Sequence, residues 1–212
     1  MKRTFYLVLG TFVLGAIAYC IYDYRVALGI AGPRTNRSAG NPDQNASGLH
    51  PAHIDWQLLD RSPDGFRVQM PTGSDETQIP AYNALGGVEQ INMLMATPGA
   101  ETTFGVAWAD HPPVERASSR DAEKTLDLAR DGALARTQTV LTGESRTRID
   151  GYPECQFSAR NDHGGILNAR LVLAGTHLYM LIVTFPDANA RSEADVDRFF
   201  DSFTLVQASS AD

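Results

Sequence analysis

The residues that could do chemistry gather first in the stretch GYPECQFSARNDHGG, between positions 151 and 165. It holds Cys155, the last cysteine of the chain, with Asp162 and His163 close behind it. A thiol, an imidazole and a carboxylate can serve as nucleophile, base and orienting group in covalent catalysis. The stretch therefore raises the hypothesis of a cysteine nucleophile, which depends on whether the three groups can meet.

The spacing argues against a catalytic thiol. Eight residues separate Cys155 from His163, and an extended strand at about 3.3 Å per residue would place them roughly 20 Å or more apart. Counting back from a four-residue turn over positions 162–165 sets Cys155 opposite Val172, and a two-residue turn then sets Val172 opposite Tyr179. These neighbours belong to a core, where a thiol has a raised pKa. We expect Cys155 to be a buried structural residue.

Other polar residues stand at the ends of expected strands, where site residues are often found. The candidates for a surface site are Asp110, His111, Asp162, His163 and His177. None has the paired spacing of a zinc-binding helix, and the chain has no nucleophile elbow, phosphate loop or dinucleotide fingerprint. We therefore expect no catalytic residue, no metal and no cofactor.

Two carboxylates raise the possibility of a glycosidase pair. Glu144 and Glu154 are ten positions apart, but a glycosidase needs both carboxylates to face one cleft. No sequence pattern places them there, so we do not assign this activity.

The composition is that of a folded, acidic protein. The 212 residues are 43% hydrophobic and 20% charged, with a formal net charge of −7. This is enough chain for one ordinary domain and an appendage. Binding of phosphates needs a basic face, and none is visible, so nucleic acid is not an expected partner.

The N-terminal region, residues 1–30, predicts a membrane segment. An uncharged, mostly apolar run extends from Phe5 to Tyr22, and as a helix it would span about 27 Å, close to the ~30 Å hydrocarbon core of a bilayer. We expect an uncleaved signal anchor that crosses the membrane once. Lys2 and Arg3 would keep the N-terminus in the cytoplasm and the C-terminal domain outside it. The alternative is a signal peptide cleaved near Ala18, which would leave a secreted or periplasmic protein.

The rest of the chain divides into a tether, a domain and a tail. Residues 31–53 are rich in Gly, Pro, Asn and Ser without periodicity, as in a flexible linker. Residues 54–207 carry the strand and helix patterns of one folded domain, and residues 208–212 form a tail.

Within the domain the patterns predict mostly strands and two helices. Helical spacing of small and apolar residues predicts one helix from Ala122 to about Ala135, capped by Asp121, and Ser192 opens a second over Glu193 to Asp201. The expected strands cover residues 55–59, 66–70, 88–96, 104–109, 145–149, 154–161, 166–174, 177–185 and 203–206. The fold class is therefore α+β, one antiparallel sheet with helices packed on it, preceded by a single N-terminal apolar helix.

The order of elements and several short motifs resemble the PsbP-like domain family, which includes many uncharacterised exported bacterial proteins. The motifs are Gly65-Phe66-Arg67-Val68-Gln69-Met70-Pro71, the Gly151-Tyr152-Pro153 turn, Leu178-Tyr179 and Phe199-Phe200-Asp201-Ser202-Phe203. The resemblance implies an α/β/α sandwich in which helices pack on both faces of the sheet. It also implies a non-enzymatic binding or assembly role.

The functional expectation combines the membrane segment with this resemblance. We expect a membrane-anchored or exported, non-catalytic binding or accessory domain on the outer side of the membrane, with an envelope protein or a small ligand as its partner. The alternative is an exported hydrolase that uses His and Asp residues of the loops.

Overall fold

The computed structural model describes residues 54–82, 88–98, 102–110 and 119–206. The expected N-terminal apolar helix, the linker and the C-terminal tail lie outside these ranges. Among the helices that are described, none combines the length and the apolar character that a membrane span needs.

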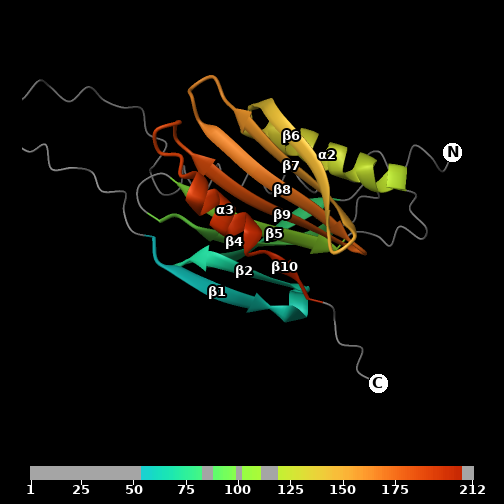
Figure 1. Cartoon of the computed structure of the whole chain (residues 1–212). Helices are drawn as coiled ribbons and strands as arrows, with labels where there is room; N and C mark the ends of the chain where they lie inside the picture. Colours follow the sequence, from blue (N-terminus) through green and yellow to red (C-terminus); the bar gives the residue numbers. More distant parts are fainter. Residues whose placement is uncertain (1–53, 83–87, 99–101, 111–118, 207–212) are drawn as a thin grey trace, which may run out of the picture.

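The described residues form two antiparallel sheets and two α-helices (Figure 1). The larger sheet has seven strands in the order β3-β4-β5-β9-β8-β7-β6, and the smaller has three in the order β1-β2-β10. The helices are α2 (Ser119–Thr137) and α3 (Glu193–Asp201), with a short 3-10 helix η1 (Ser62–Asp64). The strands are β1 (Trp56–Arg61), β2 (Phe66–Pro71), β3 (Asp75–Tyr82), β4 (Val88–Ala96), β5 (Thr103–Asp110), β6 (Val140–Ile149), β7 (Tyr152–Arg160), β8 (Ile166–Ala174), β9 (His177–Phe185) and β10 (Thr204–Leu205).

The predicted fold class is wrong. The prediction was an α+β domain in which one antiparallel sheet lies between helices, whereas the described chain is mostly antiparallel strand and contains a second sheet. The small sheet shares one face of the large sheet with α3, and α2 lies on the other face (Figure 1). A hairpin signal shows that β1 and β2 pair, but it does not show which sheet they join, and this is why the second sheet was missed.

One strand was not predicted at all. β3 has the sequence DETQIPAY, which is polar and contains Pro80, and both features argue against a strand. It lies at an edge of the large sheet, paired only with β4 among the described strands. Proline is tolerated at an edge because one side of such a strand has no ladder partner.

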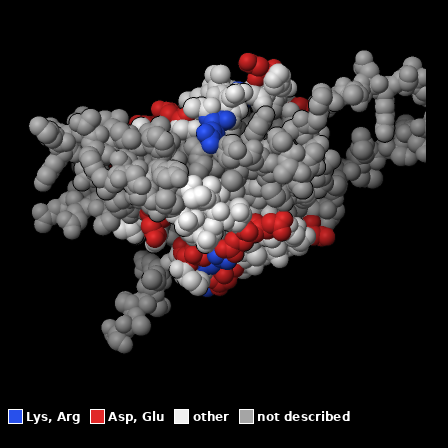
Figure 2. Space-filling model, turned by 180° about the vertical axis from the view of Figure 1, so that it is seen from behind, with Lys and Arg blue, Asp and Glu red and all other residues white. Residues whose placement is uncertain are grey.

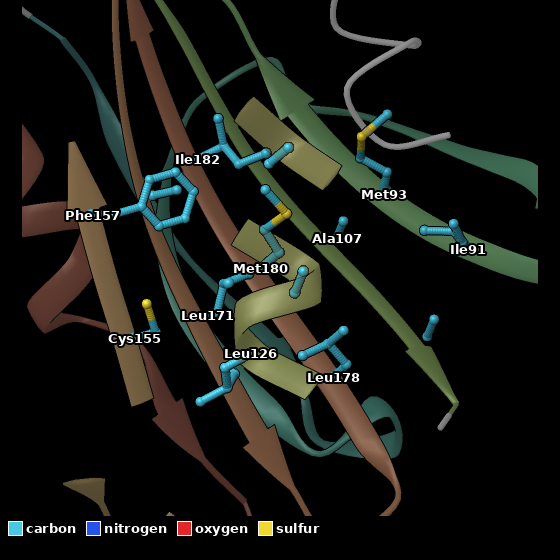
Figure 3. Packing of buried hydrophobic residues seen from close by; sticks show 14 of the residues in the cluster. Ile91, Met93, Ala107, Leu126, Cys155, Phe157, Leu171, Leu178, Met180 and Ile182 are labelled. Atoms are coloured by element: carbon cyan, nitrogen blue, oxygen red, sulfur yellow. The ribbon is translucent and has the colours of Figure 1, made fainter. Parts of the chain in front are cut away.

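Two apolar cores fill the two faces of the large sheet, because alternate side chains of a strand point to opposite faces. On one face α2 packs through Leu126, Ala129 and Ala133 against a cluster that includes Cys155 and Met180 (Figure 3).

The second core lies between the large sheet, the small sheet and α3. It is rich in aromatic rings, and the ring of Phe66 contacts three of the others. Its centroid lies 5.1 Å from that of Trp108, 5.6 Å from that of Tyr179 and 5.7 Å from that of Phe203.

The pairing of Cys155 differs from the prediction by one residue. β7 pairs with β8 so that Cys155 lies opposite Leu171, not Val172. Val172 does lie opposite Tyr179, as predicted. A shift of one residue changes the face of the sheet on which partners meet, so Cys155 shares the α2 face with Leu171 and not the aromatic core with Tyr179.

The cause of this shift is Asn161, which belongs to the turn and not to the strand. Its side-chain Oδ1 accepts hydrogen bonds from the backbone N–H groups of His163 (3.0 Å) and Gly165 (2.8 Å). An asparagine that bonds to the backbone two and four residues ahead closes a turn. The loop therefore has one residue more than the four that were predicted.

The element boundaries were predicted unevenly. α3 has the predicted bounds, and the Ser192 side chain accepts from the N–H of Asp195 at 3.3 Å. α2 starts at Ser119, so Asp121 lies in its first turn and is not its cap. β6 starts at Val140, because the predicted break near position 142 is a β-bulge within the strand.

Candidate functional site

Asp110 and His177 are brought together at one end of the large sheet. They lie opposite each other on β5 and β9, and His177 Nδ1 is 2.9 Å from Asp110 Oδ1. Both side chains are open to solvent, with exposed fractions of 41% for His177 and 91% for Asp110. An exposed pair of this kind adds little to stability. Within the described residues His177 Nδ1 makes no hydrogen bond, so the pair is a close contact and not an imidazole oriented by a carboxylate.

Tyr179 is the nearest described aromatic neighbour of this pair, and it is not available as a nucleophile. Its ring centroid lies 6.0 Å from that of His177. The hydroxyl donates to the backbone carbonyl of Asp64 at 2.8 Å. Burial, followed by the nearby charges of Asp64 and Asp110, raises the pKa of Tyr179 to about 12. The phenol is therefore protonated and fixed near neutral pH.

Asp162 and His163 lie at the opposite end of the sheet. They belong to the turn between β7 and β8, whereas His177 follows the turn between β8 and β9. β8 has nine residues, so these two ends are roughly 30 Å apart at about 3.3 Å per residue. The candidates thus fall into two separate groups. His111 lies outside the described residues, and within these residues no group of three or more His, Cys, Asp or Glu side chains is placed to hold a metal ion.

Cys155 is buried, which confirms the prediction of a structural thiol. It is 0% exposed, and its side chain lies among apolar residues beneath α2 (Figure 3). Burial raises the pKa of the Cys155 thiol to about 11, with the charge of Arg146 opposing this effect. A thiol with so little thiolate is a poor nucleophile.

Glu144 and Glu154 do not form a glycosidase pair, because their side chains lie on opposite faces of the large sheet. Glu144 lies opposite Phe157 on the α2 face. Glu154 is the residue immediately before Cys155, so its side chain points to the other face. Each carboxylate is held by arginine. Glu144 contacts Arg146 at 2.7 Å and also Arg130, and Glu154 contacts Arg170 at 3.1 Å.

Sequence reasoning missed a group of polar contacts around Asp64. Its Oδ1 accepts from the indole Nε1 of Trp108 at 3.1 Å, and its Oδ2 accepts from Nε of Arg61 at 2.8 Å. Arg61 also lies over the Trp108 ring and makes two hydrogen bonds to Glu76, of 2.9 and 3.0 Å. These contacts join η1 and the small sheet to the large sheet. The Pro-Asp-Gly motif predicted the turn at Asp64. It did not predict that Asp64 accepts hydrogen bonds from Trp108, 44 residues away, and Tyr179, 115 residues away.

A second missed group is the ion-pair network between α2 and β6. Arg146 contacts three carboxylates, those of Glu123 and Asp127 on α2 at 2.5 Å each and that of Glu144 at 2.7 Å. Arg130 of α2 also contacts Glu144. The spacing of acidic residues by four along the helix was the available signal. The four carboxylates of Glu123, Asp127, Asp131 and Glu144 outnumber the two arginines, so the network holds α2 in place and keeps an excess of negative charge.

Among the charged side chains on the face that Figure 2 shows, acidic ones (red) predominate, and basic ones (blue) lie singly or among them. Four large apolar side chains of the described residues are exposed, namely Leu58, Val140, Leu141 and Tyr152. The surface thus offers hydrogen-bonding and apolar contacts on β1, on β6 and at the start of β7.

No protein-family model matches the chain, and no curated protein matches it. Among solved structures, the fold is similar to that of cyanobacterial PsbP (CyanoP) from Synechocystis sp. PCC 6803. The TM-score is 0.53 at 12% sequence identity, and the match covers 78% of this chain and 99% of that chain. At this identity the likeness shows the fold alone, so the described domain has a PsbP-like fold.

A weaker match is a protein of unknown function, PA94, from Pseudomonas aeruginosa. Its TM-score is 0.32 at 12% identity, covering 64% of this chain and 85% of that chain. This score is too low to support a conclusion about fold or function.

Proposed function

We propose that this protein is a non-catalytic binding domain that is anchored in a membrane, or exported, and faces the outer side. The observation that supports it best is the separation of the candidate catalytic groups. Cys155 is buried with a raised pKa, and the described imidazoles of His163 and His177 belong to opposite ends of the large sheet. The Cys155 thiol is surrounded by apolar side chains, so neither described imidazole stands beside it as a base.

The membrane location rests on the sequence. The apolar run from Phe5 to Tyr22 is long enough to span a bilayer, Lys2 and Arg3 precede it, and residues 31–53 have the composition of a tether. Cleavage near Ala18 would release the same domain to the outer side, so the outward location is common to both forms. A polypeptide partner in the cell envelope fits this location. The acidic surface and its exposed apolar residues suit a protein better than a nucleic acid.

The experiment is affinity purification from solubilised membranes after crosslinking in intact cells. The full chain carries a tag at its C-terminus, and the control carries the same residues 1–53 joined to an unrelated folded domain. We expect an envelope protein to be recovered with the full chain and not with the control. Protease added to intact cells should remove the tag, because the domain faces outward. If the full chain were recovered alone, or with the same proteins as the control, that result would count against a partner role.

A second candidate is an exported hydrolase, and the contact between Asp110 and His177 favours it. The 2.9 Å separation places a carboxylate beside a partly exposed imidazole, which could act as a general base toward a water molecule. The test compares the wild-type chain with His177→Ala on ester, peptide and glycoside substrates, and His163→Ala is the matched control from the other end of the sheet. An activity lost in the first variant and kept in the second would favour the hydrolase over the binding domain.

A further inference from the structure

β6 lies at one edge of the large sheet, and its outer side has no partner among the described strands. It is ten residues long and most of its residues are exposed, although the side chains of Glu144 and Arg146 are only 21% and 27% exposed. Unpaired N–H and C=O groups along such an edge are a template for another strand. We propose that β6 pairs antiparallel with β6 of a second copy of this chain, so that the two large sheets become continuous.

The charges along β6 select one register for this pairing. In a two-fold arrangement centred on Ser145, Glu144 of each copy lies opposite Arg146 of the other, with Arg148 diagonal to it. Centring on Glu144 or on Arg146 would set two identical charges opposite each other. Centring on Thr147 would set Arg146 opposite Arg148. Of the registers near the middle of the strand, the one centred on Ser145 matches opposite charges without opposing like ones.

This register also brings together the apolar residues at the two ends of β6. Val140 and Leu141 begin the strand with exposed fractions of 69% and 37%, and Tyr152, which is 36% exposed, pairs with Ile149 at its end. With Ser145 at the centre and the bulge at 141–143 counted, Val140 of one copy lies opposite Ile149 of the other, on the face that also carries Tyr152. Leu141 lies on the α2 face, opposite Arg148 of the other copy. The two-fold axis repeats this contact at both ends. Val140 and Tyr152, two of the four exposed large apolar residues of the described chain, would thereby leave water.

The other described edges suit this pairing less well. β3 contains Pro80, which lacks an N–H group, and β1 has six residues. The bulge between Leu141 and Gly143 limits the regular ladder of β6 to its middle, so that the contact area is small. Small interfaces belong to complexes that dissociate readily. The expected product is therefore a reversible dimer.

The first test is disulfide crosslinking of the full chain in isolated membranes, with Cys20→Ser in every sample. Ser145→Cys places two thiols opposite each other, with Cβ atoms about 4.5–5.5 Å apart, close to the spacing of a disulfide. Gln78→Cys on β3 is the matched control, because Gln78 is exposed on the other edge of the same sheet. We expect the first variant to form a linked dimer at least about tenfold faster than the second. Equal rates would overturn the proposal.

The second test measures the dissociation constant of the full chain by sedimentation in detergent. Val140→Glu would set a carboxylate against the apolar side chains of Ile149 and Tyr152 of the other copy, and Leu58→Glu makes the same change at the exposed apolar residue on β1. Both positions are exposed, so both variants should keep the wild-type urea midpoint. We expect the first to raise the dissociation constant about tenfold and the second to leave it unchanged. A wild-type chain that is monomeric at every concentration, or two variants that weaken the dimer equally, would refute the pairing while leaving the proposed binding role untouched.

Discussion

Replacing Gly65 by alanine should destabilise the protein more than the same change at Gly73. Both residues have left-handed backbones, with φ of 83° and 78°, so a Cβ costs each about 1–2 kcal/mol. At Gly73 no atom lies within 4 Å of the added Cβ, whereas at Gly65 the hydroxyl oxygen of Tyr179 lies 2.6 Å away. Tyr179 is 1% exposed, and its hydroxyl donates to the Asp64 carbonyl at 2.8 Å. The ring therefore has no room to move into water.

The size of the extra effect follows from that hydrogen bond. Displacing the Tyr179 hydroxyl leaves a buried donor and a buried carbonyl without partners, which costs about 1–3 kcal/mol. Added to the backbone strain, Gly65→Ala should lower the free energy of unfolding by roughly 2–5 kcal/mol. Gly73→Ala should lower it by roughly 1–2 kcal/mol, so the difference between the two measures the contact with Tyr179.

Urea denaturation followed by tryptophan fluorescence measures these free energies, because Trp108 lies in the aromatic core beside Phe66. Tyr179→Phe removes the oxygen that the new Cβ meets. The double variant with Gly65→Ala should therefore be less destabilised than the sum of the single variants by about 1–3 kcal/mol. Two results would refute this reasoning: equal losses at Gly65 and Gly73, or strict additivity of the Gly65 and Tyr179 substitutions.

Three further predictions concern buried or ion-paired groups. In the Cys20→Ser variant, Cys155 should react with a thiol reagent at pH 8 only as fast as the protein unfolds locally or globally, because its pKa is about 11 and it is 0% exposed. Rapid labelling without urea would contradict this. Arg170→Met should cost about 3–5 kcal/mol because it leaves Glu154 buried without a partner, and adding Glu154→Leu should recover part of this loss, as urea midpoints would show. Partial burial raises the pKa of Glu144, but hydrogen bonds from two arginines outweigh it and hold this pKa below its usual value. The ionised form of Glu144 therefore stabilises the fold above the unfolded pKa, and this contribution is lost as pH falls through the lowered pKa. Glu144→Gln should flatten the decline of the free energy of unfolding between roughly pH 5 and pH 3. An unchanged slope would count against the ion pairs.

The sequence predicted those parts of the fold that local chemistry controls. The turn over Pro63, Asp64 and Gly65 and the two-residue turn after Ala174 were predicted from residues that prefer such backbones, and the structure has both. Helical spacing also predicted which face of α2 packs, since Leu126 and Ala129 are buried. These features depend on residues within a few positions of each other.

What the sequence did not predict depends on partners far along the chain. The second sheet requires β10 to pair with β2, across more than 130 positions. The contact between Asp110 and His177 requires β5 to pair with β9, although each residue was a candidate by itself. The one-residue error in the pairing of Cys155 came from Asn161, a residue that can either continue a strand or close a turn through its side chain. Periodicity does not distinguish these two outcomes.

The small sheet constrains the order in which the protein can be completed. Its first two strands are made early, but β10 pairs with β2, and the N–H of Val206 donates to the carbonyl of Gly65 at 2.8 Å. The aromatic core beneath it also needs Phe199 and Phe203. A ribosome therefore has to release position 206 before this layer can close, and until then β1 and β2 expose an apolar face. Because distant pairing of this kind slows folding, we expect closure of the small sheet to be one of the last steps by which the domain is completed.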